Sequence, residues 1–305
     1  MKDHGFRGWY KRKCSVAFPL LLILPTLAFL IVFCIYPMVR GFGYSLTNYE
    51  RSNPLEYQFV GLKNFVKIFK EDKIFKGALL ISVKWVVLQV GLQLVLGMIF
   101  ALILNQKFMG RGFVRTFCFA PWAVSGVLTT MLWLLIYNEH IGLLNHVLKF
   151  LGMKSMTKAW IQNLDTAFGA LVLAELWRGI PFFAISLLGG LQTVSGELYE
   201  SAKIDGANSW NCFWKITLPY MKESIVFAAL MRTIWEFRSV DMIITMTNGG
   251  PVRKTLTLPI YMYQTSITNG KYGYGSALTV ILFVIMSIYV FCYLKLNDFG
   301  KGVNE

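Results

Sequence analysis

Ionisable side chains inside apolar stretches are the residues of this sequence best placed to do chemistry. Each would cost about 2.5–3.5 kcal/mol at the centre of a membrane helix on insertion scales. Most form acid–base pairs three or four residues apart, so the two members of a pair would share one helix face. The residues are Lys84 and the pairs Glu175–Arg178, Arg232–Glu236 and Arg238–Asp241. Such pairs either tie helices together, lie near the membrane surface, or line a path for a polar solute.

Patterns for catalysis, metal binding and nucleotide binding are missing from the sequence. The five cysteines contain no C-x-x-C pair, and the three histidines lack the spacing of zinc ligands. No G-x-x-x-x-G-K-[ST] phosphate loop is present, so the chain does not bind ATP by that device. The glycine-rich stretch 270–276 follows no strand and is interpreted as a turn. We therefore expect a protein that is not an enzyme, with no catalytic and no metal residues.

Long apolar stretches recur along the whole chain and must position these charges. Of its 305 residues 55% are hydrophobic and only 15% are charged, whereas soluble domains average about 25% charged. Basic residues between the apolar stretches account for the net charge of +14, which therefore does not indicate nucleic-acid binding. The sequence predicts an all-α, polytopic membrane protein with six helices that each meet the requirement of about 20 residues. The predicted spans are residues 16–36, 78–104, 113–137, 167–191, 224–246 and 275–294.

The first apolar stretch is interpreted as a retained span, because it is long and lacks the small-residue exit of a cleaved signal peptide. Its basic front favours a cytoplasmic N-terminus, although the basic residues of all segments together divide evenly between the two sides. Residues 61–76 place apolar side chains near helical spacing with lysines opposite. They are expected to form an amphipathic helix, either at a membrane surface or in a solvated loop.

A long polar loop with a definite pattern separates the fourth and fifth predicted spans. A helix can begin at Ser195 or Gly196, with acidic residues near its positive end. Gly206 would end that helix, since glycine tolerates the left-handed conformation. A second amphipathic piece carries Trp210, Phe213, Trp214 and Ile216 and ends at Pro219. Two short helices meeting at a glycine would form a knob that either docks on a partner or lies on lipid.

This loop resembles the cytoplasmic signature of permease subunits of bacterial binding-protein-dependent ABC importers, E-A-A-x-x-x-G, nine residues, I-x-L-P. The chain has Glu200-Ser201-Ala202 and Asp205-Gly206, then nine residues, then Ile216, Leu218 and Pro219. Ser201 replaces the first alanine of the signature. The stretches 175–207, "GLKNF", "IGLLN" and "TNGGP" are similar to the carbohydrate, maltose-type branch of the family. The resemblance covers nearly all of the chain after its basic N-terminal segment.

The resemblance implies the fold of a type I ABC importer permease in the bacterial cytoplasmic membrane, with both termini cytoplasmic. It divides the chain into a basic N-terminus 1–15, a segment 16–77 with the first span and an extracellular amphipathic part, a core 78–296 and a tail 297–305. The loop 193–222 of the core would couple to a separate ATPase. The expected coupling residues are Glu200, Ala202, Asp205, Gly206, Ile216, Leu218 and Pro219. No cofactor is expected in this chain, because ATP and Mg would be bound by that ATPase.

The implied partners are a second homologous permease, two copies of the ABC ATPase, an extracellular sugar-binding protein, the sugar and membrane lipid, with no nucleic acid. ATP would close the two ATPases, and the docked loops would rock the permease halves between inward- and outward-facing states. In maltose-type relatives the stretch matching residues 235–243 is rich in asparagine and lines the sugar cavity, whereas charged groups stand there in this chain. The expected substrate-pathway residues are Trp177, Arg178, Trp235, Glu236, Arg238, Ser239 and Asp241.

Two other functions remain open on the sequence. An ABC permease of this kind could carry glycerol phosphate, a polyamine or another polar solute instead of a sugar. A secondary transporter would use carboxylates such as Glu175, Glu236 and Asp241 as proton sites. No internal repeat supports that second case, and it leaves the patterned loop unexplained.

Overall fold

Helices make up almost all of the regular structure in this protein. The structure, a computed structural model, describes residues 21–297. Within them the only pairing of extended residues is one bridge between Thr47 and Phe59. The expected N-terminus 1–15 and the tail beyond residue 297 lie outside the described residues. The chain divides into two compact units, the first with boundaries Met1–Lys70 and Thr265–Val280, the second with Glu71–Gln264 and Ile281–Glu305.

The first unit contains the first predicted span, which is observed as the continuous helix Leu21–Ser45. This helix includes a π-helical turn η1 (Ile31–Ile35) and ends as α2 (Tyr36–Ser45). No residue of its most apolar window is buried by other residues of this unit. The short helix α3 (Lys63–Lys70) is attached to the end of α2 by Asn64, whose side-chain amide donates to the carbonyl oxygens of Ser45 and Thr47 at 2.9 and 2.8 Å.

The amphipathic helix expected over residues 61–76 is shorter in the structure than predicted. It ends with α3 at Lys70, and Lys73 already begins the long helix α4 (Lys73–Asn105). Asp72 separates the two helices because its carboxylate oxygen Oδ1 accepts from the backbone N–H groups of Ile74 and Phe75 at 2.8 and 3.0 Å, which is a helix N-cap. The last four residues of the predicted amphipathic helix therefore belong to α4, the helix that contains the second predicted span.

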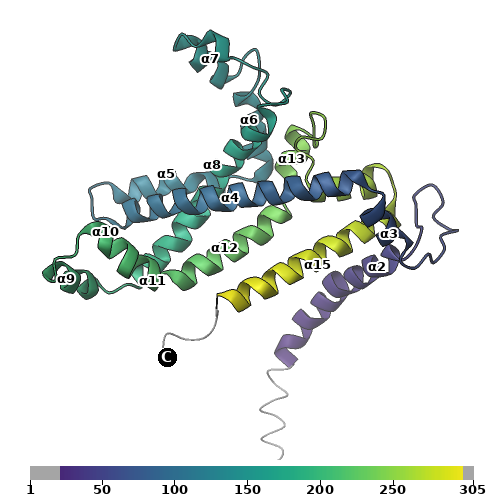
Figure 1. The fold of residues 1–305 in the computed structure, drawn as a ribbon, viewed down its shortest axis with the longest axis horizontal. Helices are drawn as coiled ribbons and strands as arrows, with labels where there is room; N and C mark the ends of the chain where they lie inside the picture. The colour runs from purple at the N-terminus through teal and green to yellow at the C-terminus, as the bar shows by residue number, and fades with distance from the viewer. Residues whose placement is uncertain (1–20, 298–305) are drawn as a thin grey trace, which may run out of the picture. The chain divides into compact units, whose positions relative to one another are not determined.

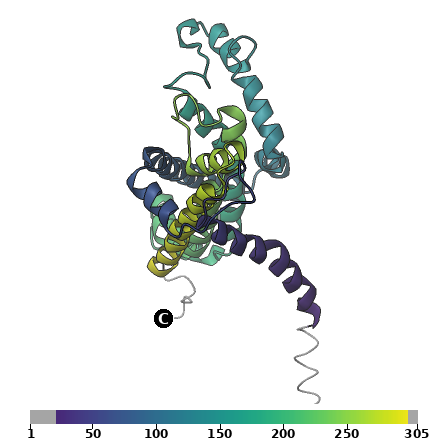
Figure 2. The same cartoon turned by 90° about the vertical axis from the view of Figure 1, so that its right-hand side faces the viewer.

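The core of the second unit is formed by α4 and α8 (Ala167–Gln192), which pack along each other (Figure 1). The helices α5 (Arg111–Ala123) and α12 (Lys222–Phe237) pack against this pair. The remaining elements of the chain are α6 (Gly126–Ile136), α7 (Leu143–Phe150), η2 (Lys154–Met156), α9 (Gly196–Ile204), α10 (Ser209–Cys212), η3 (Phe213–Thr217), α11 (Leu218–Tyr220), α13 (Asp241–Met246), α14 (Leu258–Tyr263), η4 (Gln264–Thr268) and α15 (Tyr272–Leu296). Figure 2 shows α6 and α7 extending away from α4 and α8.

Two of the six predicted spans are broken. Four helices among the described residues are long and apolar enough to cross a membrane, or five if the bent pair α5 and α6 counts as one span. The third predicted span bends by 97° between these two helices, where Val124 is extended and Ser125 caps α6. In the fifth, α12 ends at Phe237 and α13 begins at Asp241. Six continuous spans are therefore not confirmed, and α15 supplies the last long helix.

Gly97 allows α4 and α8 to approach closely, which gives a first prediction. A Cβ atom at Gly97 would overlap the Cβ atom of Phe183 on α8. We expect Gly97→Ala to destabilise the protein by about 1–3 kcal/mol through overpacking. The matched control is Gly91→Ala on the same helix, because a Cβ atom there meets nothing within 4 Å. Thermal unfolding of the purified protein in detergent measures the effect, and equal unfolding temperatures for the two variants would contradict it.

Candidate functional site

The first half of the 193–222 loop folds as a capped helix that ends at a left-handed glycine. Ser195 caps α9, its hydroxyl oxygen accepting from the backbone N–H of Glu197 at 3.3 Å. Gly206 has φ +83°, and the next N–H, of Ala207, donates to the carbonyl oxygen of Ala202 at 2.8 Å. This closure reverses the chain direction and separates α9 from α10. The predicted start, end and glycine conformation of this helix are confirmed.

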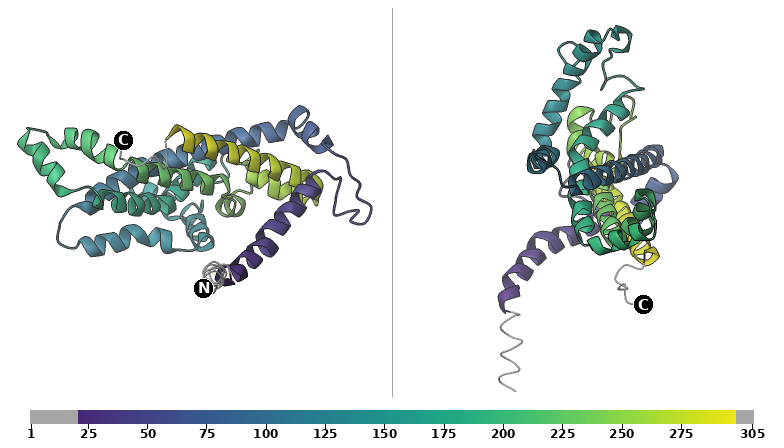
Figure 3. Two further views of the ribbon diagram at one scale, coloured as in Figure 1. Left: turned by 90° about the horizontal axis from the view of Figure 1, so that it is seen from below. Right: turned by 90° about the vertical axis from the view of Figure 1, so that its left-hand side faces the viewer.

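The second half of the loop fixes this knob to the helix bundle. Asn208 caps α10, its side-chain oxygen accepting from the N–H of Asn211 at 2.8 Å. The hydroxyl groups of Tyr199 and Thr217 lie 3.0 Å apart and join the two halves. Apolar side chains from both halves, Leu198, Phe213, Ile216 and Leu218, pack against a core cluster formed by residues of α4, α8 and α12 together with Val194 and Met221. The knob lies beyond the C-terminal end of α4 (Figure 3).

The predicted coupling residues divide between the two sides of the knob. Ala202, Ile216 and Leu218 are half-buried, and the last two pack on the core cluster. Glu200, Asp205, Gly206 and Pro219 are exposed. Ile204 is 86% exposed between two of them. These exposed residues thus offer two carboxylates and the apolar side chains of Ile204 and Pro219 on a support that is continuous with the bundle core.

A second group of functional candidates, here named the buried charge cluster, consists of the buried Glu175, Arg232 and Glu236 and the half-buried Arg178. Arg232 Nη2 lies 2.7 Å from Glu175 Oε1 and 2.7 Å from Glu236 Oε1. Arg178 forms a two-pronged pair with Glu175, at 2.8 and 3.0 Å. The expected pairs Glu175–Arg178 and Arg232–Glu236 are confirmed, and Arg232 joins them into one cluster. Two positive and two negative groups balance, as burial of charge requires.

Neutral polar side chains on α4 complete the cluster. Trp85 Nε1 donates to Glu236 Oε2 at 2.9 Å, and Gln93 Nε2 donates to Glu236 Oε1 at 3.2 Å. Arg232 Nε donates to Gln93 Oε1 at 2.6 Å. Gln89 accepts from Gln93 at 2.8 Å and donates to the Val172 carbonyl oxygen at 3.1 Å. The network therefore connects α4, α8 and α12, and its glutamines were a signal that the sequence analysis did not use.

The other predicted substrate-pathway residues lie outside this network. Trp235 is 38% exposed, and its ring packs edge-on against Phe182 at a centroid distance of 4.9 Å. Arg238, Ser239 and Asp241 occupy or adjoin the break between α12 and α13. The expectation that Arg238 and Asp241 share a helix face is wrong, because α12 ends before the first and α13 begins at the second. No ion pair forms between these two exposed residues.

Residues 93–298 match the family model described as "Binding-protein-dependent transport system inner membrane component". The chain belongs to this family. A relative named trehalose/maltose transport system permease protein MalF, from Thermococcus litoralis, is 36% identical over 92% of this chain and 94% of its own length. The multiple sugar-binding transport system permease protein MsmF of Streptococcus mutans is 32% identical over 90% and 93% of the two chains.

A solved structure supports the fold assignment of this transport component. One chain of a bacterial alginate ABC transporter, in complex with an alginate pentasaccharide-bound periplasmic protein, has a TM-score of 0.83 at 19% identity. The match covers 96% of this permease and 99% of that chain. The prediction of an all-α, multi-pass inner-membrane protein with the ABC importer permease fold is confirmed. The chain is a permease subunit of a binding-protein-dependent importer, not an enzyme.

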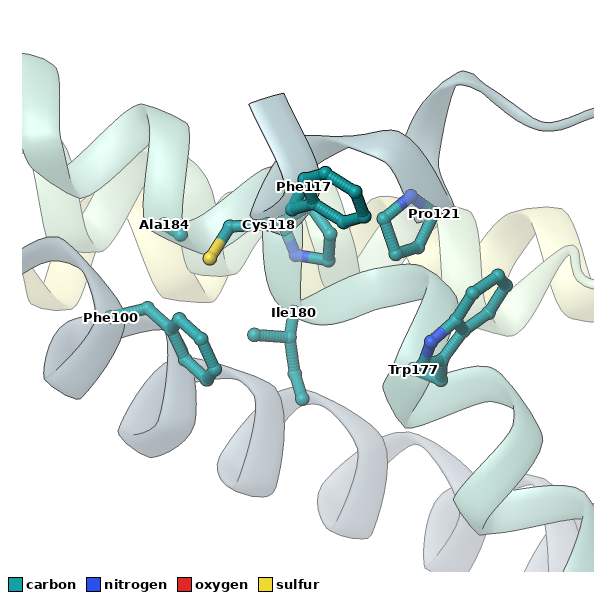
Figure 4. A pocket seen from close by; sticks show the side chains of 8 residues that line it. Phe100, Phe117, Cys118, Pro121, Trp177, Ile180 and Ala184 are labelled. Carbon is teal, nitrogen blue, oxygen red and sulfur yellow. The ribbon is translucent and has the colours of Figure 1, made fainter. Parts of the chain in front are cut away.

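The permease has an apolar hollow of about 290 Å³ where Trp177 lies (Figure 4). Side chains of α4, α5 and α8 surround it: Phe100, Phe117, Cys118, Pro121, Trp177, Ile180, Pro181 and Ala184. Only the indole N–H and the thiol could hydrogen-bond with an occupant, so the hollow fits hydroxyl-rich ligands poorly. Among residues 21–297 no group of three His, Cys, Asp or Glu side chains could hold a metal ion.

Proposed function

We propose that the permease forms half of the translocation pathway of an ATP-driven importer for sugars or oligosaccharides. The observation that carries this proposal is the similarity along nearly its whole length to a relative named as a trehalose/maltose permease, at 36% identity. The relative MsmF is named for multiple sugars, and a third, SmoG of Agrobacterium fabrum, for sulfoquinovosyl glycerol at 32% identity. Saccharides are the chemistry that these names share.

The proposed assembly contains a second homologous permease, two copies of an ABC ATPase and an extracellular sugar-binding protein. Mg and ATP are bound by the ATPase subunits. The exposed Glu200, Asp205 and Gly206 support docking of the 193–222 loop in a groove of the ATPase, with Glu200 near a basic residue. Because the loop packs on the core of α4 and α8, a displacement of the docked knob moves these helices as well.

The proposed topology has six crossings, with both termini and the 193–222 loop in the cytoplasm. The division into the terminus 1–15, the segment 16–77, the core 78–296 and the tail 297–305 remains part of this proposal. The bent pair α5–α6 and the broken pair α12–α13 each count as one crossing. Discontinuous helices are tolerated at membrane depth where the freed backbone groups line a protein cavity.

The proposed substrate path follows the break between α12 and α13. Arg238 and Asp241 are exposed there, and Ser239 and the ring of Trp235 are partly accessible, so hydroxyl groups and a sugar face both find partners. In this proposal Arg178, Glu236 and Trp177 hold the residues of the path in position and do not bind the sugar themselves. Arg178 and Glu236 are already engaged in ion pairs of the buried charge cluster.

Uptake by proteoliposomes tests the function. The assembled transporter is studied with its external binding protein present. It is expected to transport labelled maltose, trehalose or an acidic oligosaccharide only when MgATP is present on the side of the membrane that carries the ATPase subunits. A protonophore should leave this uptake unchanged. Uptake driven by a proton gradient without ATP would indicate a secondary transporter. ATP-driven uptake of a polyamine or glycerol phosphate, but of no sugar, would contradict the proposed cargo.

A further inference from the structure

One side of α3 exposes apolar side chains in a row along the helix. Leu62 precedes the helix, and the Val66 N–H donates to its carbonyl oxygen at 3.0 Å, so the helical spacing already begins there. Positions 62, 66 and 69 therefore share one face. Leu62, Val66 and Phe69, here named the apolar row, have exposed fractions of 67%, 49% and 53%. Contiguous exposed apolar side chains mark a surface for a membrane or a partner.

A row of lysines lies beside the apolar row. Lys63, Lys67 and Lys70, here named the lysine row, each follow a member of the apolar row by one position and are all exposed. One residue turns the helix by about 100°, so the two rows occupy neighbouring faces. Among the described residues none of the three ammonium groups forms an ion pair, and Glu71 is the only carboxylate in residues 61–71. The lysine row is therefore a basic surface that can attract anions.

The third face of α3 fixes the helix to the rest of its unit. Ile68 is fully buried, and Asn64 donates to the carbonyl oxygens of Ser45 and Thr47 at 2.9 and 2.8 Å. Ser45 is the last residue of the continuous helix Leu21–Ser45, which is long and apolar enough to cross a membrane. Figure 1 shows α3 beside the end of α2. The helix α3 is thus held at the level at which this span ends.

The chain leaves α3 directly into a second membrane helix. Lys70 ends α3 and Lys73 begins α4, which is likewise long and apolar enough to cross a membrane. Three steps of about 3.8 Å between consecutive Cα atoms cover at most about 11 Å. A helix held at the end of one span, and separated along the chain from the next span by so short a connection, lies at the membrane surface. Its two exposed rows are therefore within reach of lipid headgroups.

We propose that α3 anchors the permease in the headgroup layer of the membrane, with the lysine row binding the phosphate groups of anionic phospholipids. The apolar row enters the boundary between headgroups and acyl chains. Helices with lysines on one face and Leu or Phe on another bind membranes through buried apolar area and attraction to anionic lipid. An ammonium group binds phosphate as a point charge. The topology proposed above makes this surface the outer leaflet, and the anchor does not depend on the cargo.

The test measures lipid contact with a fluorescent probe on the apolar row. In the assembled transporter with its cysteines replaced, Val66→Cys carries a bimane label. The vesicles contain phosphatidylcholine with brominated acyl chains, which quench the label on contact. We expect strong quenching at Val66→Cys and at Leu62→Cys, a second probe of the same row. The matched control is Val252→Cys, on a valine that is 82% exposed between α13 and α14 and should be quenched much less.

A second arm measures selectivity for anionic lipid. Brominated phosphatidylglycerol, as a minor component of unbrominated phosphatidylcholine vesicles, should quench the Val66→Cys probe about threefold more strongly than the same amount of brominated phosphatidylcholine. Replacing the lysine row should reduce this ratio to about one. Added salt should lower the ratio in the wild-type background. The replacements are Lys63→Gln, Lys67→Gln and Lys70→Gln.

The control for charge removes two exposed cations elsewhere, by Arg253→Gln with Lys254→Gln, and should leave the ratio unchanged. An absence of quenching at both probes of the apolar row would overturn the proposal, because α3 would then face water. If added binding protein shielded such an unquenched probe, the row would belong to that protein instead. A ratio of about one before the lysines are replaced, or a ratio that survives their replacement, would also overturn it.

A labelling experiment separates this proposal from the topology that assigns the leaflet. In the same background with its cysteines replaced, Lys63→Cys should react with a membrane-impermeant maleimide added outside intact cells. Reaction only after permeabilisation would overturn the proposed topology and place the anchor at the inner leaflet. The quenching results do not depend on this outcome, because the vesicles contain brominated lipid in both leaflets.

Discussion

Gly206→Val is expected to uncouple import from ATP hydrolysis and reduce uptake strongly, while the permease stays inserted in the membrane. Gly206 has φ +83°, and a side chain at such a left-handed position costs about 1–2 kcal/mol. A Cβ atom there meets nothing within 4 Å, so the cost comes from the backbone and not from a clash. We expect the variant to relieve this strain by changing the direction of the chain between α9 and α10. That change would misplace the exposed side of the knob that docks on the ATPase.

The measurement compares uptake and ATP hydrolysis in the assembled transporter. We expect uptake to fall about tenfold or more, because typical coupling free energies correspond to changes of this size. ATP hydrolysis should no longer be stimulated by the binding protein. Gly196→Val is the matched control, because Gly196 lies in the same loop, has an ordinary φ and also has open space around its Cβ position. Normal uptake by the Gly206→Val variant would show that the loop does not couple transport.

Arg232→Gln is expected to cause the largest loss of stability among single substitutions in the bundle. Among the described residues Arg232 is the only cation that pairs with both Glu175 and Glu236, and its side chain is 6% exposed. Its removal leaves Glu236 without a cation. Breaking a buried ion pair by removing one partner costs about 3–5 kcal/mol.

Thermal unfolding in detergent provides the measurement, with two comparisons. Arg238→Gln, on an exposed arginine six positions further along, should leave the unfolding temperature nearly unchanged. Adding Glu236→Gln to Arg232→Gln should restore part of the stability, because Glu175 keeps its pair with Arg178 and no carboxylate then remains unpaired. A double variant less stable than Arg232→Gln would contradict this account of the cluster.

Local spacing in the sequence predicted those parts of the site that depend on neighbouring residues. The residues from Ser195 to Pro219 predicted a capped helix, a left-handed glycine and a second short helix, since caps and turns depend on residues a few positions apart. Helical spacing likewise predicted the pairs of Glu175 with Arg178 and of Arg232 with Glu236. These contacts need only the geometry of one helix.

Tertiary contacts decided the rest. Trp85, Gln89 and Gln93 are spaced four residues apart and share one face of α4. That spacing does not show which helices they contact, because the hydrogen bonds to Glu236 on α12 join residues 143 and 151 positions apart. The apolar stretches also predicted unbroken spans, whereas the chain bends at Val124 and interrupts its helix between Phe237 and Asp241. Hydrophobic length detects a membrane segment but does not detect a backbone break within it.

The buried charge cluster has a consequence for how the chain enters the bilayer. Arg178 lies on the same helix as Glu175, and Glu236 lies on the same helix as Arg232. Each of these segments can therefore leave the translocon with its own counter-ion, as an electrically neutral unit. The ion pair between Arg232 and Glu175 can form later, when the two segments meet. Insertion therefore does not require an unpaired charge to be exposed to lipid.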